Sequence, residues 1–309
     1  MQNKIVTVFG GTGFIGKYVV AELVNAGYTV RVVTRSLERA KNLRAGAYVG
    51  QVVPVLGDIS KPDNFAELLN GSYAVINLVG LLYERGGNQK FANIHAKAVE
   101  KLAKAAKAAK VQKFTHVSAI VPENSESKYA QTKIAGENSL QLAFPDAVIL
   151  KPSVVFGAED NFFNQFARMA TLSPFLPLIG GGKTRFQPVY VGDVAKAVVN
   201  SLQLALPGSY QLGGPQVLTF KEILQSILQY TNRKSMFISI PFFVAKIMAI
   251  PAPSFILTRD QVELLKHDNI ISTRSKGLKE LGVKPTAIEA IVPEYLARFR
   301  KKTLADTNR

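Results

Sequence analysis

The stretch "VFGGTGFIG", residues 8–16, joins the first apolar run of the sequence to its first helical pattern. It overlaps the end of an apolar run over 4–10 and the start of a helical pattern over 15–26. Two glycine patterns overlap in it, G-x-x-G-x-x-G from Gly10 and G-x-G-x-x-G from Gly11. Glycines at such a junction allow a tight turn and let backbone N–H groups approach a pyrophosphate at the helix N-terminus. The context predicts a dinucleotide-binding loop, with a tight turn that binds no ligand as the alternative.

Apolar runs alternate with helical patterns through the first half of the chain. Strands are expected over residues 4–10, 29–35, 51–58, 74–80, 113–120 and 147–157. Helices are expected between them over residues 15–26, 64–71, 92–110 and 129–143. Nearly continuous Val, Ile and Leu runs are typical of strands buried on both faces, and helical crossovers imply parallel pairing. The pattern therefore predicts an α/β, Rossmann-like, doubly wound parallel sheet.

The regular alternation ends after Gly157, where prolines and the "GGGK" at 180–183 indicate loops. We expect residues 1–157 to form the nucleotide-binding core. Residues 158–309 are expected to form a smaller, mixed lobe for substrate or docking, with some segments returning to the core. Near Asp193 the pattern predicts a short strand that leads into a helix.

Composition narrows the possible functions. The chain has 309 residues, of which 47% are apolar and 19% charged, so it can bury a sizeable core. It has no cysteine, which excludes disulfides and thiolate chemistry, and its three histidines do not have metal-ligand spacing. A net charge of +16 favours an anionic partner, but no nucleic-acid motif accompanies it. Because strand signal begins at Lys4, we expect no leader segment and a cytoplasmic location.

Arginines follow the second expected strand. Arg35 stands where an NAD-binding fold usually carries Asp or Glu, and Arg39 follows one helical turn later. Because a guanidinium matches a 2′-phosphate, we predict NADP(H) rather than NAD(H), with an ordinary surface arginine as the alternative. Asp58 ends the third strand, where its carboxylate could accept from an adenine amino group or cap the following turn.

A tyrosine–lysine pair suggests chemistry. Tyr129 and Lys133 form Y-x-x-x-K, and positions i and i+4 share one helix face. A neighbouring ammonium stabilises a phenolate, which could exchange a proton with a carbonyl or alcohol during hydride transfer. Ser118 ends the fifth strand and could hold a substrate oxygen. A chance pair and an ordinary strand-end serine are the alternatives.

Together these residues resemble the extended and atypical branches of the short-chain dehydrogenase/reductase superfamily. The resemblance selects the frame of Gly10, Gly13 and Gly16, and Asn93 matches the asparagine at the start of the fourth helix. "KPSVVFG" at 151–157 is similar to the stretch beside the nicotinamide in that superfamily.

The resemblance implies two sets of site residues. The catalytic set is Tyr129, Lys133, Ser118 and Asn93. The cofactor-binding set is Gly10, Gly11, Thr12, Gly13, Phe14, Ile15, Gly16, Arg35, Arg39, Asp58, Ile59, Leu78, Val79, Gly80, Lys133 and Pro152. No metal site is expected.

Longer stretches resemble one branch more closely. "GGTGFIGKYVV", "VINLVGLLYE", "KPSVVFGAEDNFFNQFA" and "FQPVYVGDVA" are similar to the short-chain-dehydrogenase-like accessory subunits of respiratory complex I and their alphaproteobacterial relatives. The resemblance implies firm binding of NADPH, complex I subunits as partners, and a peripheral position on the inner face of the bacterial inner membrane. It also links related proteins to ubiquinone biosynthesis.

The segment 237–257 carries a single charge, on Lys246. Its length approaches a membrane span, but Pro241, Pro251 and Pro253 argue against a continuous spanning helix. One interpretation is packing in the protein's own core. The other is a short apolar helix and loop that rest on an anionic membrane surface or a hydrophobic partner.

Three functions follow in order of preference. The first is an NADP(H)-binding accessory or assembly subunit of complex I. The second is an NADP(H)-dependent oxidoreductase acting on a hydrophobic carbonyl, quinone or isoprenoid compound, with a role in ubiquinone biosynthesis. The third is a sugar-nucleotide epimerase or dehydratase. Whether a bound nucleotide turns over is left open.

Overall fold

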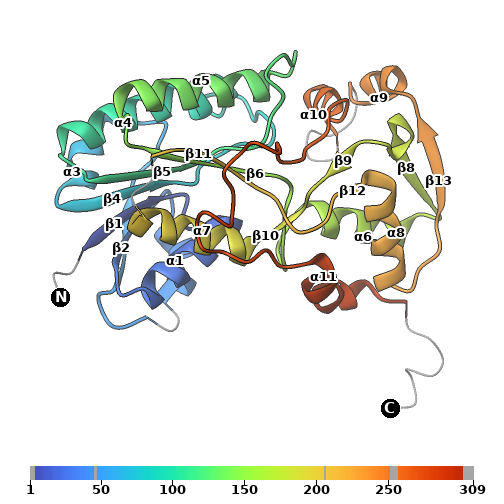
Figure 1. Cartoon of the computed structure of the whole chain (residues 1–309), viewed down its shortest axis with the longest axis horizontal. Coiled ribbons are helices and arrows are strands. Elements are labelled where there is room, and N and C mark those ends of the chain that lie inside the picture. The colour runs from blue at the N-terminus through green and yellow to red at the C-terminus, as the bar shows by residue number, and fades with distance from the viewer. Residues whose placement is uncertain (1–3, 45–46, 205–206, 251–256, 302–309) are drawn as a thin grey trace. The chain divides into compact units, whose positions relative to one another are not determined.

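The computed structural model describes residues 4–44, 47–204, 207–250 and 257–301 (Figure 1). The chain forms two compact units whose segments alternate along the sequence. The first unit consists of Met1–Pro152, Val191–Leu212 and Ile271–Lys284. The second consists of Ser153–Tyr190, Gly213–Ile270 and Pro285–Arg309.

The first unit is built on a seven-stranded parallel sheet in the order β11-β6-β5-β4-β1-β2-β3. Its strands are β1 (Ile5–Phe9), β2 (Thr29–Thr34), β3 (Val52–Leu56), β4 (Ser72–Asn77), β5 (Lys113–Val117), β6 (Val148–Pro152) and β11 (Gly208–Leu212). The order reverses between β1 and β4, which places a ligand crevice at the carboxyl ends of these strands. The predicted doubly wound parallel sheet is confirmed.

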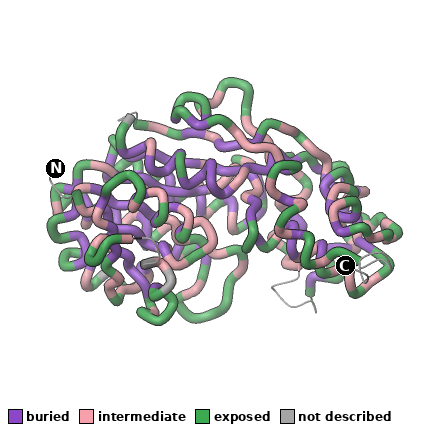
Figure 2. Tube along the Cα trace, turned by 90° about the horizontal axis from the view of Figure 1, so that it is seen from below, coloured by how far each residue is buried: buried purple, intermediate pink, exposed green. Residues whose placement is uncertain are grey.

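Helices cover both faces of this sheet (Figure 1). The helical elements of the first unit are α1 (Phe14–Asn25), α2 (Leu37–Ala40), η1 (Lys41–Arg44), η2 (Pro62–Asn64), α3 (Phe65–Leu69), η3 (Ala92–Lys97), α4 (Ala98–Ala108), α5 (Lys128–Ala143) and α7 (Val191–Leu204). Helices α3, α4 and α5 lie on one face, and α1 and α7 pack together on the other. Most residues of β1, β2, β4, β5 and β6 are buried, because apolar side chains leave water on both sides of the sheet. Figure 2 shows buried, intermediate and exposed residues along the chain trace.

Three local features differ from the sequence prediction. The helix expected over 92–110 begins with one π-helical turn, η3. The strand expected over 147–157 is two strands, β6 and β7 (Val155–Phe156). Between them Ser153 Oγ donates to Asn269 O, and Asn269 Oδ1 accepts from the backbone N–H of Val154, so the chain leaves the sheet after β6. Strand β11 was not predicted.

The second unit has an aromatic core. Its helical elements are α6 (Phe162–Leu172), η4 (Gly180–Gly182), α8 (Phe220–Tyr230), α9 (Phe242–Met248), α10 (Arg259–Leu264), α11 (Ile288–Leu296) and η5 (Ala297–Phe299). Its short strands are β7, β8 (Phe175–Ile179), β9 (Arg185–Phe186), β10 (Val189–Tyr190), β12 (Leu218–Thr219) and β13 (Met236–Ile240). Phe156, Phe163, Phe186 and Phe220 are buried at its centre.

The apolar segment 237–257 forms β13 and α9 as far as the structure describes it, while Pro251 and Pro253 lie outside the described residues. One face of this segment packs inward, with Ala245 against Ile179 and Val262. The opposite face, including Phe243 and Ile247, is exposed. Among the residues with described placement, no helix is both long and apolar enough to cross a membrane.

Candidate functional site

The glycine loop between β1 and α1 fits a pyrophosphate. Gly10 has a φ of +84°, which a residue with a side chain rarely adopts. A Cβ on Gly16 would lie 2.2 Å from the carbonyl oxygen of Gly10, so α1 packs on the loop only with glycine there. A Cβ on Gly13 would meet one atom, Gly10 O at 3.2 Å, which shows a hollow above this residue. Since no side chain caps α1, its first N–H groups can receive an anion in that hollow.

Both glycine frames have structural reasons. Gly10, Gly13 and Gly16 form the turn, the hollow and the helix contact. Gly11 has a different role, because a Cβ there would lie 2.9 Å from Val32 Cγ1 on β2. The overlapping pattern therefore combines open space at Gly13 with close packing of Gly11 against the neighbouring strand.

The residues predicted for the adenosine end lie after β2 and β3. Arg35 directly follows β2, Arg39 lies in α2, and both side chains are exposed. Asp58 Oδ1 accepts from the backbone N–H and the hydroxyl of Ser60, each at 2.9 Å, so this carboxylate caps a turn. Ile59 is buried in the core. Contacts of these residues with a nucleotide stay predictions.

The predicted tyrosine–lysine pair lies on one face of α5. Lys133 Nζ is 5.8 Å from the ring centroid of Tyr129. Lys133 is only 3% exposed. Burial lowers the pKa of Lys133 from 10.5 to about 8, although the negative charge of Glu137 opposes this shift. The ammonium is thus held beside the phenol in a poorly hydrated place.

Gly80 lies in the loop after β4 and leaves room for Lys133. A Cβ on Gly80 would lie 3.3 Å from Lys133 Nζ. Leu78 and Val79 precede it and are half-buried, and Asn77 Oδ1 fixes this loop by accepting from the N–H of Val79 at 3.0 Å. The loop therefore brings three predicted cofactor residues to the carboxyl end of β4.

Ser118 follows β5 and belongs to a network of buried polar side chains. Its hydroxyl donates to Glu137 Oε1, and Glu137 Oε2 pairs with Lys151 Nζ at 2.5 Å. Ser118 and Glu137 are both buried. Pro152, another predicted cofactor residue, is buried at the end of β6 beside Lys151. Three elements, β5, α5 and β6, are thus joined by one buried polar network.

His95 supports the face of Tyr129. The two rings meet edge to face with centroids 5.2 Å apart. His95 Nε2 accepts from the backbone N–H of Leu81 at 2.9 Å, so the proton of the neutral ring is on Nδ1, which faces Thr132 Oγ1 at 3.3 Å. Burial, with a smaller contribution from Lys133, lowers the pKa of His95 to about 2.

Asn93 lies on the π-helical turn η3, two residues before His95, and is half-buried. The structure thus places Asn93, Tyr129 and Lys133 on the neighbouring elements η3 and α5. Sequence reasoning did not find Glu137, Lys151 or His95. Glu137 had a signal, because it continues the four-residue spacing of Tyr129 and Lys133.

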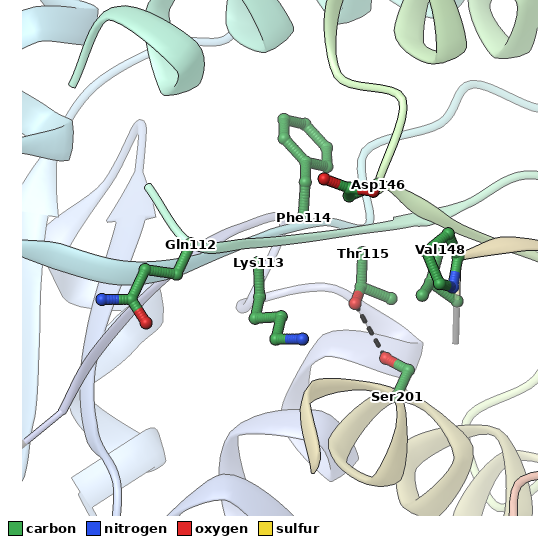
Figure 3. Close-up of a pocket in the computed structure, with 8 residues that line it drawn as sticks. Gln112, Lys113, Phe114, Thr115, Asp146, Val148 and Ser201 are labelled. Carbon is green, nitrogen blue, oxygen red and sulfur yellow. Dashed lines mark hydrogen bonds between the residues drawn. The ribbon is translucent and has the colours of Figure 1, made fainter. Parts of the chain in front are cut away.

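A cavity of about 230 Å³ lies at the opposite end of the sheet (Figure 3). Its wall is formed by Gln112, Lys113, Phe114, Thr115, Asp146, Val148, Ser201 and Pro207. Thr115 Oγ1 and Ser201 Oγ are hydrogen-bonded there at 2.8 Å. Because this cavity is at the amino ends of β5 and β6, it is separate from the glycine loop and the tyrosine–lysine pair.

The reversal of strand order, the glycine loop and the adjoining tyrosine–lysine pair define the class of nicotinamide dinucleotide-binding α/β proteins. The chain belongs to the NAD dependent epimerase/dehydratase family, whose sequence profile matches residues 6–213.

Individual proteins are similar to this chain over most of its length. The mitochondrial NADH dehydrogenase [ubiquinone] 1 alpha subcomplex subunit 9 of Arabidopsis thaliana is 33% identical, over 97% of this chain and 79% of that protein. A ceramide reductase of Caulobacter vibrioides is 27% identical, over 77% of this chain and 74% of that protein. Among solved structures, the dTDP-glucose 4,6-dehydratase DesIV of Streptomyces venezuelae, with NAD and TYD bound, has the same fold, with a TM-score of 0.72, 20% identity and 96% of each chain covered.

Proposed function

We propose that this chain is an NADP(H)-binding accessory or assembly subunit of respiratory complex I at the membrane surface. The observation that carries the proposal is its similarity to a complex I subunit along nearly its whole length, 33% identity over 97% of the chain. The ceramide reductase matches less of the chain, over 77%.

Co-migration tests the assembly role. Gently solubilised membranes of the host are separated on a native gel, which is probed for this chain and for NADH dehydrogenase activity. We expect the chain to migrate with that activity. Migration only as a small free species would contradict the proposal and favour a free reductase. A strain without this chain provides the control, and we expect less assembled complex in it.

We further propose that the first unit binds NADP(H) at the glycine loop. The hollow above Gly13 and the uncapped start of α1 suit the pyrophosphate. Arg35 and Arg39 are exposed beyond the end of β2, where this fold class places the 2′ position of the adenosine ribose, and a guanidinium there suits a 2′-phosphate. Lys133 adds a buried ammonium on α5 near the loop after β4.

Arg35→Gln tests the preference for the phosphorylated cofactor. A charge-assisted hydrogen bond to phosphate contributes enough that its loss should weaken NADPH binding by roughly tenfold or more. NADH affinity should be nearly unchanged, because NADH has no 2′-phosphate. Fluorescence titration of both nucleotides measures the ratio, with Arg39→Gln as the second variant. Equal affinity of the wild type for NADH and NADPH would refute the preference.

The membrane part of the proposal rests on α9 and β13. Phe243 and Ile247 are 67% and 62% exposed on α9, and Met236 on β13 is 62% exposed. These side chains are apolar, and the chain carries a net charge of +16. An anionic bilayer has an apolar interior for these side chains and negative headgroups that attract a basic protein, so it complements both properties.

Phe243→Asp/Ile247→Asp tests this surface. Wild-type protein should sediment with vesicles that contain phosphatidylglycerol. The variant should bind them at least roughly tenfold more weakly, because two apolar side chains no longer enter the bilayer. Leu142→Asp is the control, since Leu142 is also an exposed apolar side chain but belongs to α5 of the first unit. Equal sedimentation of all three proteins would exclude membrane docking through α9.

A second function is an NADP(H)-dependent reductase of a hydrophobic carbonyl compound. It is favoured by the neighbouring Tyr129 and Lys133, with a pKa of about 8 for the lysine, and by the ceramide reductase among the relatives. For this function Tyr129→Phe should abolish NADPH oxidation and leave NADPH affinity within about twofold, because only the phenolic oxygen is lost. Spectrophotometric turnover and binding titrations measure both. A large loss of binding would give Tyr129 a structural role.

A further inference from the structure

The single hydroxyl proton of Ser118 has an acceptor inside the protein. A serine hydroxyl has one proton to donate and two lone pairs that accept. An ionised carboxylate can only accept, so the bond between Ser118 Oγ and Glu137 Oε1 uses the serine proton. Lys151 Nζ forms an ion pair with the other oxygen of Glu137 at 2.5 Å. Ser118 is left with lone pairs only.

Burial keeps this arrangement in place. Ser118 and Glu137 are each 5% exposed, so water competes little for the bond between them. A hydrogen bond to a charged group is also stronger than one between neutral groups. A ligand carbonyl at Ser118 would have to displace the carboxylate and leave Glu137 short of one donor in a buried place, which is unfavourable.

Ser118 lies where its hydroxyl can contact a ligand, so the direction of its hydrogen bonds affects binding. The residue directly follows β5, at the carboxyl edge where this fold binds ligands. Tyr129, Lys133 and Glu137 succeed one another at four-residue intervals on the face of α5 that contains the candidate site. Glu137 therefore links the serine to the tyrosine–lysine pair.

We propose that Glu137, held by Lys151, is a positioning residue that makes Ser118 an acceptor of hydrogen bonds, so that the site selects a ligand offering a hydroxyl or N–H group over one offering a carbonyl. This inference rests on the proposed dinucleotide site. It is opposite to what a reductase needs, since polarising a substrate carbonyl requires a donor.

A matched pair of probes tests the inference without turnover. 1-Phenylethanol is titrated into protein loaded with NADPH, and acetophenone into protein loaded with NADP⁺, so that no hydride can be transferred in either complex. The variants are Ser118→Ala, which removes the lone pairs, and Glu137→Leu/Lys151→Met, which releases the serine proton. Replacing both partners of a buried ion pair by apolar residues is often neutral for stability.

Ser118→Ala should weaken binding of the alcohol about fivefold, because one accepted hydrogen bond is lost. The affinity for the ketone should not change. Glu137→Leu/Lys151→Met should tighten binding of the ketone about fivefold and leave the alcohol unchanged. The control is Glu100→Leu/Lys104→Met, an exposed pair on α4 with the same 2.5 Å separation, which should change neither.

The opposite result is equally clear. If Ser118→Ala weakens binding of the ketone, the serine donates to the ketone oxygen and the inference is wrong. Parallel loss of both probes in the double variant would show a purely structural network and would also overturn it. Wild-type protein that binds neither NADPH nor NADP⁺ would refute the dinucleotide site itself, whereas normal nucleotide binding with an unchanged probe ratio would refute only the role of Glu137.

Discussion

Gly136→Ala is expected to lower the free energy of unfolding by about 3 kcal/mol, near the upper end of what overpacking costs. A Cβ at position 136 would lie 1.8 Å from the backbone carbonyl oxygen of His95, a separation that no pair of nonbonded atoms tolerates. The obstacle is backbone, so no side-chain rotation relieves it. Helix α5 and the turn η3 would have to move apart.

Moving α5 away from η3 should also displace residues of the candidate site. His95 and Tyr129 meet edge to face across the same helix contact, and the hydrogen bond from Leu81 N–H to His95 fixes the loop after β4. We therefore expect weaker NADPH binding together with the loss of stability. Both effects come from one displacement, so they should appear in the same variant.

Urea unfolding and NADPH titration of Gly136→Ala measure the two effects. Asn138→Ala is the matched control, because Asn138 is exposed two residues later on α5 and alanine favours helix. The control should be at least as stable as the wild type. A Gly136→Ala protein with wild-type stability would show that η3 and α5 separate without cost, and would remove the proposed reason for the glycine.

The close contact at Gly136 also shows what the sequence could predict. Strands β1 to β6 were predictable because each is a separate apolar run, and parallel pairing follows from the helices between them. The expected burial on both faces fails for β3, which lies at the sheet edge with Val53 and Leu56 exposed. Gly10, Gly13 and Gly16 were recognisable because their spacing is local. The π-helical turn η3 was not, because the helix that approaches it closely at Gly136 comes much later in the chain.

The network around Ser118 was hidden for a similar reason. Ser118, Glu137 and Lys151 come from three separate elements, and no local spacing joins them. Strand β11 reaches the sheet edge beside β6 from a distant part of the chain. Contacts of this kind follow from the packed structure, whereas periodicity reports only which face of an element is buried.

Lys133→Met is expected to stabilise the protein at pH 7 by about 2 to 3 kcal/mol, because it removes a buried ammonium whose pKa has fallen from 10.5 to about 8. Below pH 8 Lys133 is charged in the folded and the unfolded state, so the cost of burying the charge is fully present. Between pH 8 and 10.5 the unfolded chain binds a proton that the folded protein has released. Rising pH therefore stabilises the wild type over this range, and near pH 10.5 the advantage of the variant should vanish.

The two buried histidines near Lys133 do not titrate in this window. Burial lowers the pKa of His95 to about 2 and that of His116 to about 3, so both rings are neutral from pH 7 upward. Glu137 keeps its ion pair with Lys151 when Lys133 is replaced. Urea unfolding of Lys133→Met and wild type at pH 7 and 10.5 gives the difference, with the exposed Lys101→Met as a control that should show none.

A stabilised Lys133→Met protein that has lost NADPH affinity would mean that the buried ammonium is kept for the ligand at the expense of the unliganded protein. The sign of the change decides this. If Lys133→Met is less stable at pH 7, the attraction of Lys133 to Glu137 exceeds the cost of burial, and the lysine is part of the scaffold. If stability rises while NADPH affinity stays unchanged, Lys133 does not contribute to nucleotide binding, and the proposed role of the buried ammonium is wrong.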